Sequence, residues 1–284
     1  MEELRPQTWN ELIDCLFADS WQEPLRRHRS NFAYRGMPDV RFDLRTSLMR
    51  LGPGYAALEN HLLRAFRRYA RRYIEPADSL WNWLAVAQHH GLPTRLLDWS
   101  YSPFVALHFA TATPSLMDVD GVIWAADYVD SAEYLPGALR EVLEEEGTSV
   151  FTAEMLNGVV GSLQELQALA DEPFPVFFEP PSLDDRIVNQ FALFVLMSSP
   201  HARLDEWLSA RPHIARRIIL PASLKWEVRD RLDQVNITER VLFPGLDGLS
   251  VWLTRYYQPR PGATPLEEPD DDGAHNAARR TPGA

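Results

Sequence analysis

Residues Gln88 to Ser100 bring together side chains that could do chemistry. They include two imidazoles, a guanidinium, a carboxylate, an indole and two hydroxyls, contributed by His89, His90, Thr94, Arg95, Asp98, Trp99 and Ser100. Gly91 and Pro93 predict a loop between two helices, and polar loops between rigid elements often contact ligands. We therefore predict a site here. A structural alternative stays open, in which Arg95 and Asp98 form an ion pair that braces the loop.

The paired histidines could transfer protons but do not predict a metal site. Adjacent residues on a helix point in different directions, so His89 and His90 are not expected to share a metal ion. An imidazole titrates near neutral pH and can act as an acid or base. The alternative to proton transfer is a structural role, in which the imidazole donates a hydrogen bond to one of the last carbonyls of a helix. The single cysteine, Cys15, excludes a site of several thiolates.

A second segment, Tyr34-Arg35-Gly36, ends an apolar stretch that predicts a strand. A guanidinium there could bind phosphate through two parallel hydrogen bonds, and glycine would allow close approach of the ligand. The alternative is an arginine exposed before a turn. A third segment follows Asp185, where a strand would place Arg186 and Gln190 on one face. Gln190, if buried, must be hydrogen-bonded and would brace the core or contact a ligand.

The elements that must position these residues predict an α+β fold with a mixed or antiparallel sheet. Apolar periodicity predicts helices over Trp9–Phe17, Asn60–Tyr73, Ser79–His90, Ser102–Ala112, Leu135–Glu146, Gln164–Ala170, Ser223–Gln234 and Leu246–Tyr257. Residues rich in β-branched and aromatic side chains predict strands over Asn31–Tyr34, Gly121–Tyr128, Val176–Glu179, Ile187–Met197 and Ile214–Leu220.

Composition limits the classes of function. The 284 residues carry a net charge of −12, which argues against a general nucleic-acid binder unless a basic patch exists locally. Such a patch is present in the helix over Asn60–Tyr73, where the Arg64–Arg72 stripe could contact a nucleic acid or an acidic protein, or simply be solvated. An apolar run of membrane-spanning length and a signal peptide are both missing, so we expect a cytoplasmic protein without a membrane partner.

One domain is expected over residues 1–258. The remaining residues, 259–284, are rich in proline, glycine and acidic side chains and predict a disordered tail. Zinc-protease, P-loop, Rossmann and serine-hydrolase motifs are all missing from the sequence, which disfavours those enzyme classes.

Taken together, the segments resemble the FRG domain family, which is named after a Phe/Tyr-Arg-Gly signature. Tyr34-Arg35-Gly36 is similar to that signature, Gln88 to Ala110 to the family's central motif, and Arg186 to Phe194 and Leu242 to Leu249 to its later motifs. His90 stands where the family often has tyrosine. This departure makes His89 the imidazole that we expect to matter.

The order of these motifs is also similar to the ADP-ribosyltransferase layout, which implies an NAD-using enzyme of the toxin or phage-defence type. In that layout Arg35 would bind the pyrophosphate, with Tyr34, Gly36, Arg95, Trp99 and Arg186 nearby, and Thr94 or Ser100 would supply a hydroxyl. Gln190 occupies the position of the transferase glutamate, which the sequence lacks. The open alternatives are a non-catalytic module that binds a nucleotide, nucleic acid or protein, and a hydrolase or nuclease that uses His89 and Asp98.

Overall fold

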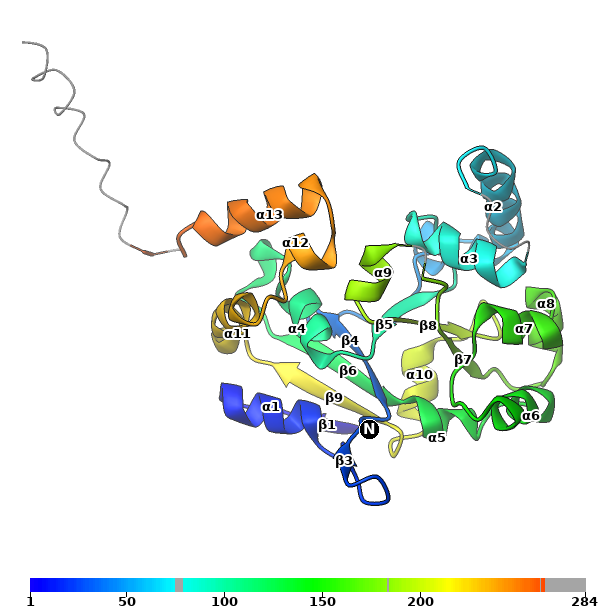
Figure 1. Ribbon diagram of the computed structural model, residues 1–284, viewed down its shortest axis with the longest axis horizontal. Coiled ribbons are helices and arrows are strands. Elements are labelled where there is room, and N and C mark those ends of the chain that lie inside the picture. Colours follow the sequence, from blue (N-terminus) through cyan, green and yellow to red (C-terminus); the bar gives the residue numbers. More distant parts are fainter. Residues whose placement is uncertain (75–78, 183, 261, 264–284) are drawn as a thin grey trace, which may run out of the picture.

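A seven-stranded mixed sheet organises the protein, whose computed structural model describes residues 1–74, 79–182, 184–260 and 262–263 (Figure 1). Its strands are β1 (Glu2–Leu4), β4 (Phe32–Met37), β5 (Leu97–Ser100), β6 (Gly121–Asp127), β7 (Pro175–Phe178), β8 (Ala192–Met197) and β9 (Ala215–Leu220). The strand order is β1-β9-β6-β4-β5-β8-β7. The β1–β9 pair is parallel and the other neighbouring pairs are antiparallel.

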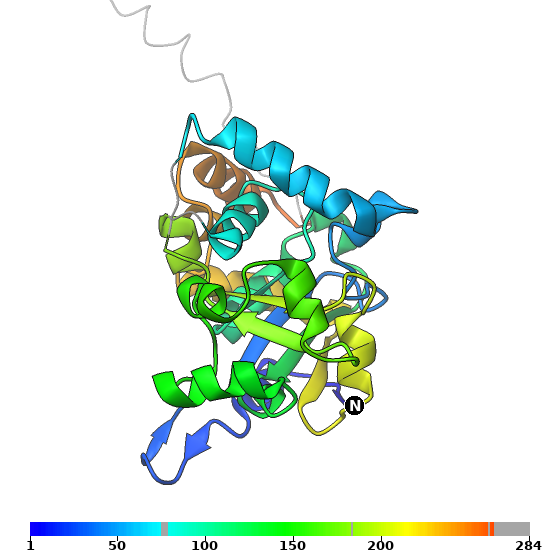
Figure 2. The same ribbon diagram turned by 90° about the vertical axis from the view of Figure 1, so that its right-hand side faces the viewer.

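A separate hairpin and a set of helices complete the described chain. The hairpin strands β2 (Trp21–Gln22) and β3 (Arg27–His28) project from the body of the molecule (Figure 2). The helices are α1 (Trp9–Phe17), α2 (Tyr55–Ala70), α3 (Leu80–His89), α4 (Pro103–Thr111), α5 (Tyr128–Ala132), α6 (Gly137–Glu146), α7 (Ala153–Val159), α8 (Leu163–Ala168), α9 (Asp185–Asn189), α10 (Leu204–Ser209), α11 (Ala222–Gln234), α12 (Glu239–Leu242) and α13 (Leu246–Tyr257). Short 3-10 turns lie at Met49–Leu51 and Pro114–Leu116.

Local sequence signals explain how the two helices beside the central strands begin and end. The Ser79 side chain accepts a hydrogen bond from the backbone N–H of Asn82 and caps α3. Gly91 follows this helix with a φ of 79°, which glycine adopts readily. Ser102 caps α4 and Pro103 occupies its first turn, where a missing N–H leaves no helical hydrogen bond unmade.

Apolar side chains cover both faces of the sheet, but differently. On one face a continuous cluster runs across the strands and packs against α10, with Trp99, Trp124 and Trp207 among its members. On the other face there are two clusters. The first packs α1, α4 and α11 over β4, β6 and β9, and the second packs α3, α6, α7 and α8 over β7 and β8.

The sheet opens between β4 and β5, at the boundary between these two clusters. Strand β4 pairs with β6 along its whole length, yet it pairs with β5 only at Tyr34 and Ser100. Strand β5 continues in register with β8 instead. The backbone groups of β4 and β5 beyond this one pair must therefore find other partners.

The α+β prediction with a mixed sheet is confirmed, whereas two local predictions are wrong. The segment Gln88 to Ser100 is not a loop throughout, because its last four residues form β5. The predicted strand Ile187–Met197 begins as a helix. The Asp184 carboxylate caps α9 by accepting the N–H of Ile187 at 3.1 Å, and only then does β8 start. The break between them is Phe191, whose φ is +46°.

Other differences concern short elements and helix limits. Strand β1, the hairpin and helices α5, α7, α10 and α12 were not predicted, because elements this short leave little periodicity in the sequence. Helix α2 begins at Tyr55 rather than Asn60. The predicted tail, residues 259–284, lies mostly outside the described residues. In the described ranges, no helix combines the length and apolar character needed to cross a bilayer.

Candidate functional site

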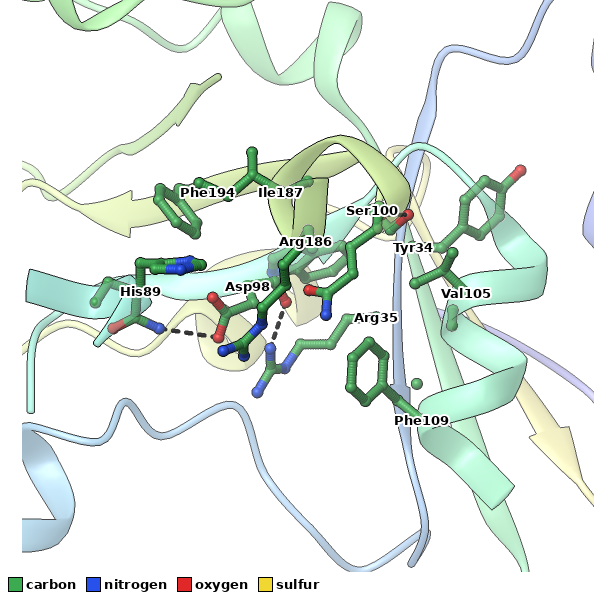
Figure 3. Close-up of a pocket in the computed structure, with 16 residues that line it drawn as sticks. Tyr34, Arg35, His89, Asp98, Ser100, Val105, Phe109, Arg186, Ile187 and Phe194 are labelled. Carbon is green, nitrogen blue, oxygen red and sulfur yellow. Dashed lines mark hydrogen bonds between the residues drawn. The ribbon is translucent and has the colours of Figure 1, made fainter. Parts of the chain in front are cut away.

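A cavity of about 220 Å³ lies where β4 and β5 separate, bounded by α3, α4 and α9 (Figure 3). Of the predicted site residues, those that line it are Tyr34, Arg35, Gly36, His89, Asp98, Trp99, Ser100, Arg186 and Gln190. Thr94 and Arg95 do not line it. The remaining wall is contributed by Gln88, Val105, Ala106, Phe109, Ile187, Ala192 and Phe194.

Arg35 spans the opening in the sheet. Its Nη1 donates a hydrogen bond to the backbone carbonyl of Asp98, which replaces a bond that strand pairing would otherwise supply. Its Nε is buried and has no hydrogen-bond partner among the described residues. Burial lowers the pKa of the Arg35 guanidinium, and the nearby Asp98 carboxylate partly offsets this. An arginine side chain nevertheless stays protonated in a protein. Arg35 is thus a charged donor with hydrogen-bonding capacity left over.

The Asp98 carboxylate is oriented by a chain of hydrogen bonds from the protein interior. The backbone N–H of Leu96 donates to Thr94 Oγ1 at 3.0 Å, so the Thr94 hydroxyl proton is free to donate to Gln88 Oε1 at 2.6 Å. That contact sets the Gln88 amide so that its Nε2 donates to Asp98 Oδ2 at 2.9 Å. Thr94, which was predicted as a catalytic hydroxyl, is buried and acts on the cavity only through Gln88.

His89 pairs with Asp184 and not with Asp98. The distance from His89 Nε2 to Asp184 Oδ2 is 2.8 Å, and the imidazole is largely buried while the carboxylate is partly exposed. Burial lowers the pKa of His89 below its ordinary value, and Asp184 opposes this effect. A neutral His89 that donates from Nε2 keeps Nδ1 as an acceptor. The predicted His89–Asp98 pair is therefore wrong, because α9 brings a different carboxylate to the imidazole.

Helix α9 supplies a second guanidinium to the cavity. Arg186 forms no ion pair with another described residue, and its guanidinium lies 5.1 Å from the centre of the Phe243 ring. Figure 3 shows the Arg35 and Arg186 side chains directed to the same part of the cavity, beside Asp98. Because Phe243 faces Arg186, the helix pair α12–α13 supports this side of the site.

Gln190 braces the fold rather than offering its amide nitrogen to a ligand. Its Nε2 donates to the backbone carbonyl of Leu242, and Asn189 donates in the same way to Val241, each at 2.8 Å. The backbone carbonyl of Gln190 accepts the Ser100 hydroxyl at 2.7 Å. These contacts fasten α9 to α12 and β5. Arg186 and Gln190 still share a face, because a spacing of four residues keeps two side chains together on a helix as it does on a strand.

The other predicted residues at the cavity have structural partners. Ser100 Oγ also accepts the N–H of Ser102, and the Tyr34 hydroxyl donates to the carbonyl of Leu16 at 2.8 Å. Trp99 packs on the opposite face of the sheet, with its ring centre 6.4 Å from that of Phe177. A Cβ on Gly36 would lie 1.7 Å from the carbonyl oxygen of Ala106. Gly36 therefore allows α4 to approach β4, rather than allowing a ligand to approach the backbone.

Arg95 lies outside the cavity in a buried ion pair. Its guanidinium contacts both oxygens of Glu59 on α2, with Nε to Oε1 at 2.7 Å, and Nη1 donates to the carbonyl of Ser198 at 2.8 Å. The ion pair considered between Arg95 and Asp98 is therefore wrong, because the partner of Arg95 is Glu59. Arg95 braces α2 against the end of β8 instead.

Several residues at or beside the cavity were missed by sequence reasoning. Asp184, which pairs with the lining residue His89, could have been found as a capping residue, because an acidic side chain ahead of Ile187 is typical of a helix start. Phe109 and Phe194 lie in the motifs that resemble the FRG family, but an apolar ring does not by itself indicate a site. Gln88 is the first residue of the central motif, yet its role depends on a hydrogen bond from Thr94 that only the fold reveals.

Comparison with known proteins adds one result. Residues 30–118 match the family model of the FRG domain. The chain contains an FRG domain. The matched segment supplies Arg35, Gln88, His89 and Asp98 to the cavity, whereas α9 and β8 lie beyond it. A search of curated proteins and a search of solved structures each found no match.

The two guanidinium groups at this cavity can therefore contact and orient an anion. Two guanidinium groups and one carboxylate meet at the cavity, next to the His89–Asp184 pair, in which the neutral imidazole donates to the Asp184 carboxylate. Apolar walls from Val105, Phe109 and Ile187 exclude part of the surrounding water, which strengthens charge interactions inside. A group of three or more potential metal ligands does not occur in the described ranges.

Proposed function

We propose that the FRG domain binds the phosphate-bearing part of a nucleotide in this cavity, through Arg35 and Arg186. The observation that supports this most strongly is the buried Nε of Arg35, which has no hydrogen-bond partner in the part of the chain that the structure describes. An unsatisfied buried donor on a charged group is unfavourable, and a phosphate oxygen would satisfy it. Arg186, which forms no ion pair among the described residues, would supply the second contact.

NAD is the nucleotide that we propose, in an ADP-ribosyltransferase-like reaction. The cavity volume, about 220 Å³, is below the range of roughly 300–1,000 Å³ typical of whole drug-sized ligands. It suits one part of a dinucleotide, with the rest outside. Cleavage of the bond between nicotinamide and ribose leaves positive charge on the ribose, which a carboxylate can stabilise. Gln190 cannot do so, and Asp98 is the carboxylate that we assign to this role.

His89 is assigned as the base of this reaction. With Asp184 accepting from Nε2, Nδ1 remains available to take the proton of the group that attacks the ribose. The lowered pKa of His89 favours the neutral form that this step requires. The Gln88 amide would keep the Asp98 carboxylate in one orientation while the charge develops.

Nicotinamide release from NAD tests the catalytic part of the proposal. Asp98→Asn preserves the shape of the side chain and removes its charge. We expect this variant to keep the rise in melting temperature produced by ADP-ribose while nicotinamide release is lost. His89→Gln should also lose release at pH 7. If ADP-ribose stabilises the wild-type protein but NAD stays intact, the domain is a non-catalytic nucleotide-binding module and Asp98 has no role in a reaction.

A further inference from the structure

Helix α2 lies at the outside of the molecule (Figure 2), and its sequence places basic and aromatic side chains on adjacent sides. Residues 60–73 contain five arginines and no aspartate or glutamate, although the whole chain has a net charge of −12. Within α2, at about 100° per residue, Arg64, Arg67 and Arg68 lie on one side of the helix and Phe66 and Tyr69 on the side next to it. Arg71, Arg72 and Tyr73 follow in the turn after the helix. Glu59, one residue earlier, is buried against Arg95 and does not neutralise this surface.

The basic side forms a groove of about 440 Å³ between α2 and the start of α3. Four guanidinium groups line it, those of Arg64, Arg67, Arg68 and Arg71. Arg68 and Arg72 lie over the rings of the tyrosines that follow them, at 5.3 and 4.5 Å. Within the described part of the chain, Arg64, Arg68 and Arg72 form no ion pair. Their charge is therefore available to an anionic partner.

The aromatic side forms a second groove, of about 450 Å³, between α2 and the end of α3. Phe66 and Tyr69 line it from α2, and Tyr73 lines it from the turn after α2. Val86 of α3 and His90, the residue after α3, form the other side. Tyr69 is 66% exposed and Tyr73 is 73% exposed. The His90 ring contacts the His89 ring at 5.1 Å, and His89 lines the cavity. The aromatic groove thus adjoins the proposed nucleotide site.

We propose that this surface, formed by α2 and the turn after it, binds single-stranded nucleic acid. Arg64, Arg68 and Arg72 contact phosphates, and Tyr69 and Tyr73 stack on bases. Exposed aromatic rings beside arginines form a platform that any unpaired base can use. A duplex keeps its bases stacked on one another and would use only the arginines. An acidic protein would likewise gain little from the two tyrosines. Because this surface is outside the cavity, the inference goes beyond the proposed function and does not depend on it.

Fluorescence anisotropy with a labelled 12-nucleotide poly(U) strand tests the basic face. The variant is Arg64→Gln/Arg68→Gln/Arg72→Gln, which keeps good helix-forming residues. The matched control is Arg27→Gln/Arg29→Gln/Arg140→Gln, which removes the same charge from exposed positions elsewhere. Each lost phosphate contact reduces the slope of log K against log salt by about 0.7. We expect the α2 variant to lose about 2 units of slope and to bind roughly a hundredfold more weakly at 0.1 M salt. The control should bind like wild type, and equal losses in the two variants would overturn the proposal.

Tyr69→Ala/Tyr73→Ala tests the aromatic face. Base stacking contributes enough per base that at least a fivefold loss of affinity is expected for the single strand. Binding of the matching RNA duplex or of polyglutamate should be weaker than that of poly(U) and should not respond to the tyrosine substitutions. Tighter binding of the duplex, tighter binding of polyglutamate, or an unchanged affinity of the double variant for poly(U) would each contradict single-strand recognition. Circular dichroism would verify that the variants are folded.

Discussion

Thr94 is a residue outside the cavity that sets the geometry of a residue inside it. Its hydroxyl accepts from a backbone N–H and donates to Gln88, so the amide of Gln88 has one orientation in which its nitrogen faces Asp98. Such orientation by a neighbour matters because a carboxylate stabilises charge best when it is already in place.

Substitution of Thr94 tests this hydrogen-bonded chain. Thr94→Val keeps the volume of the side chain and removes the hydroxyl, whereas Thr94→Ser keeps the hydroxyl. One lost hydrogen bond is worth about 1 kcal/mol. We expect nicotinamide release from NAD to slow roughly fivefold in Thr94→Val and to stay near wild type in Thr94→Ser, with the ADP-ribose dissociation constant unchanged in both. Slow nicotinamide release by Thr94→Ser, or release at the wild-type rate by Thr94→Val, would show that the hydroxyl does not position Asp98.

At the residue scale, the sequence indicated polar residues that the fold gathers at the cavity, but it did not indicate their partners. Arg35 could be selected because a guanidinium followed by glycine ends an apolar stretch, and Asp98 because it lies in a short segment rich in polar side chains. The partners of His89 and Arg95 are Asp184 and Glu59, which are distant in the chain. Local patterns cannot reveal contacts that depend on how α2 and α9 pack.

At the scale of elements, the contact between β4 and α4 depends on Gly36. A side chain there would meet the carbonyl oxygen of Ala106 at 1.7 Å and its carbon at 2.6 Å, and neither backbone atom can rotate away. This contact fixes α4, and with it the wall of the cavity that Val105 and Phe109 form.

Gly36→Ala should therefore displace α4 and destabilise the protein by about 3 kcal/mol, at the upper end of overpacking effects. Gly158→Ala is the matched control, because Gly158 is exposed in α7 and a Cβ there meets nothing within 4 Å. That variant should gain up to about 1 kcal/mol from helix propensity. Urea denaturation measures both effects. Similar free energies of unfolding for the two variants would mean that α4 can move away from β4 without destabilising the protein.

Most long elements near the site could be predicted, and α9 could not. The helices over α1, α3 and α13 have clear periodicity, and their predicted limits are close to those observed. In the stretch from Arg186 to Phe194, apolar and β-branched residues indicated a strand. The cap from Asp184 and the bonds from Asn189 and Gln190 to α12 outweigh that preference in the first part.

At the scale of the whole molecule, buried charge joins α4 to the last helices. Arg229 contacts His108 Nδ1 at 3.0 Å, and Glu239 accepts from both Arg229 and Arg255. Burial, with Arg229 adding to it, lowers the pKa of His108 to about 3. The buried imidazole is therefore neutral in the folded protein, although an unfolded chain would protonate it near pH 6.5.

This difference predicts a loss of stability in acid. The contribution of a neutral buried His108 is complete above about pH 6.5 and decreases as the pH falls toward 3, because only the unfolded chain takes up the proton. At pH 4.5 the loss is roughly 2–3 kcal/mol relative to pH 7.5. His108→Gln still offers an acceptor to Arg229 but does not titrate. Between pH 7.5 and pH 4.5, the free energy of unfolding of this variant should therefore decrease by about 2–3 kcal/mol less than that of the wild-type protein. The same pH dependence of the free energy of unfolding in the variant and the wild type would contradict a neutral, buried His108.

The opening of the sheet is the feature of the whole molecule that sequence could not reveal. It arises because β4 continues with β6 while β5 continues with β8, and pairing across strands so distant in the chain has no local signature. The α+β class with a mixed sheet could be predicted, because it depends on the kinds of element along the chain and not on which strands pair.

The central claim, that Arg35 and Arg186 bind a nucleotide phosphate in the cavity, is tested most directly by calorimetric titration with ADP-ribose. Arg186→Gln removes a partly exposed charge, Arg35→Lys keeps a charge but loses the guanidinium fork, and Arg27→Gln is the control. A hydrogen bond to a charged group contributes about 1.5–3 kcal/mol, so each site variant should bind at least about tenfold more weakly than wild type. The control should be unchanged. Equal affinity of wild type and both site variants, or no binding to wild type, would contradict the account.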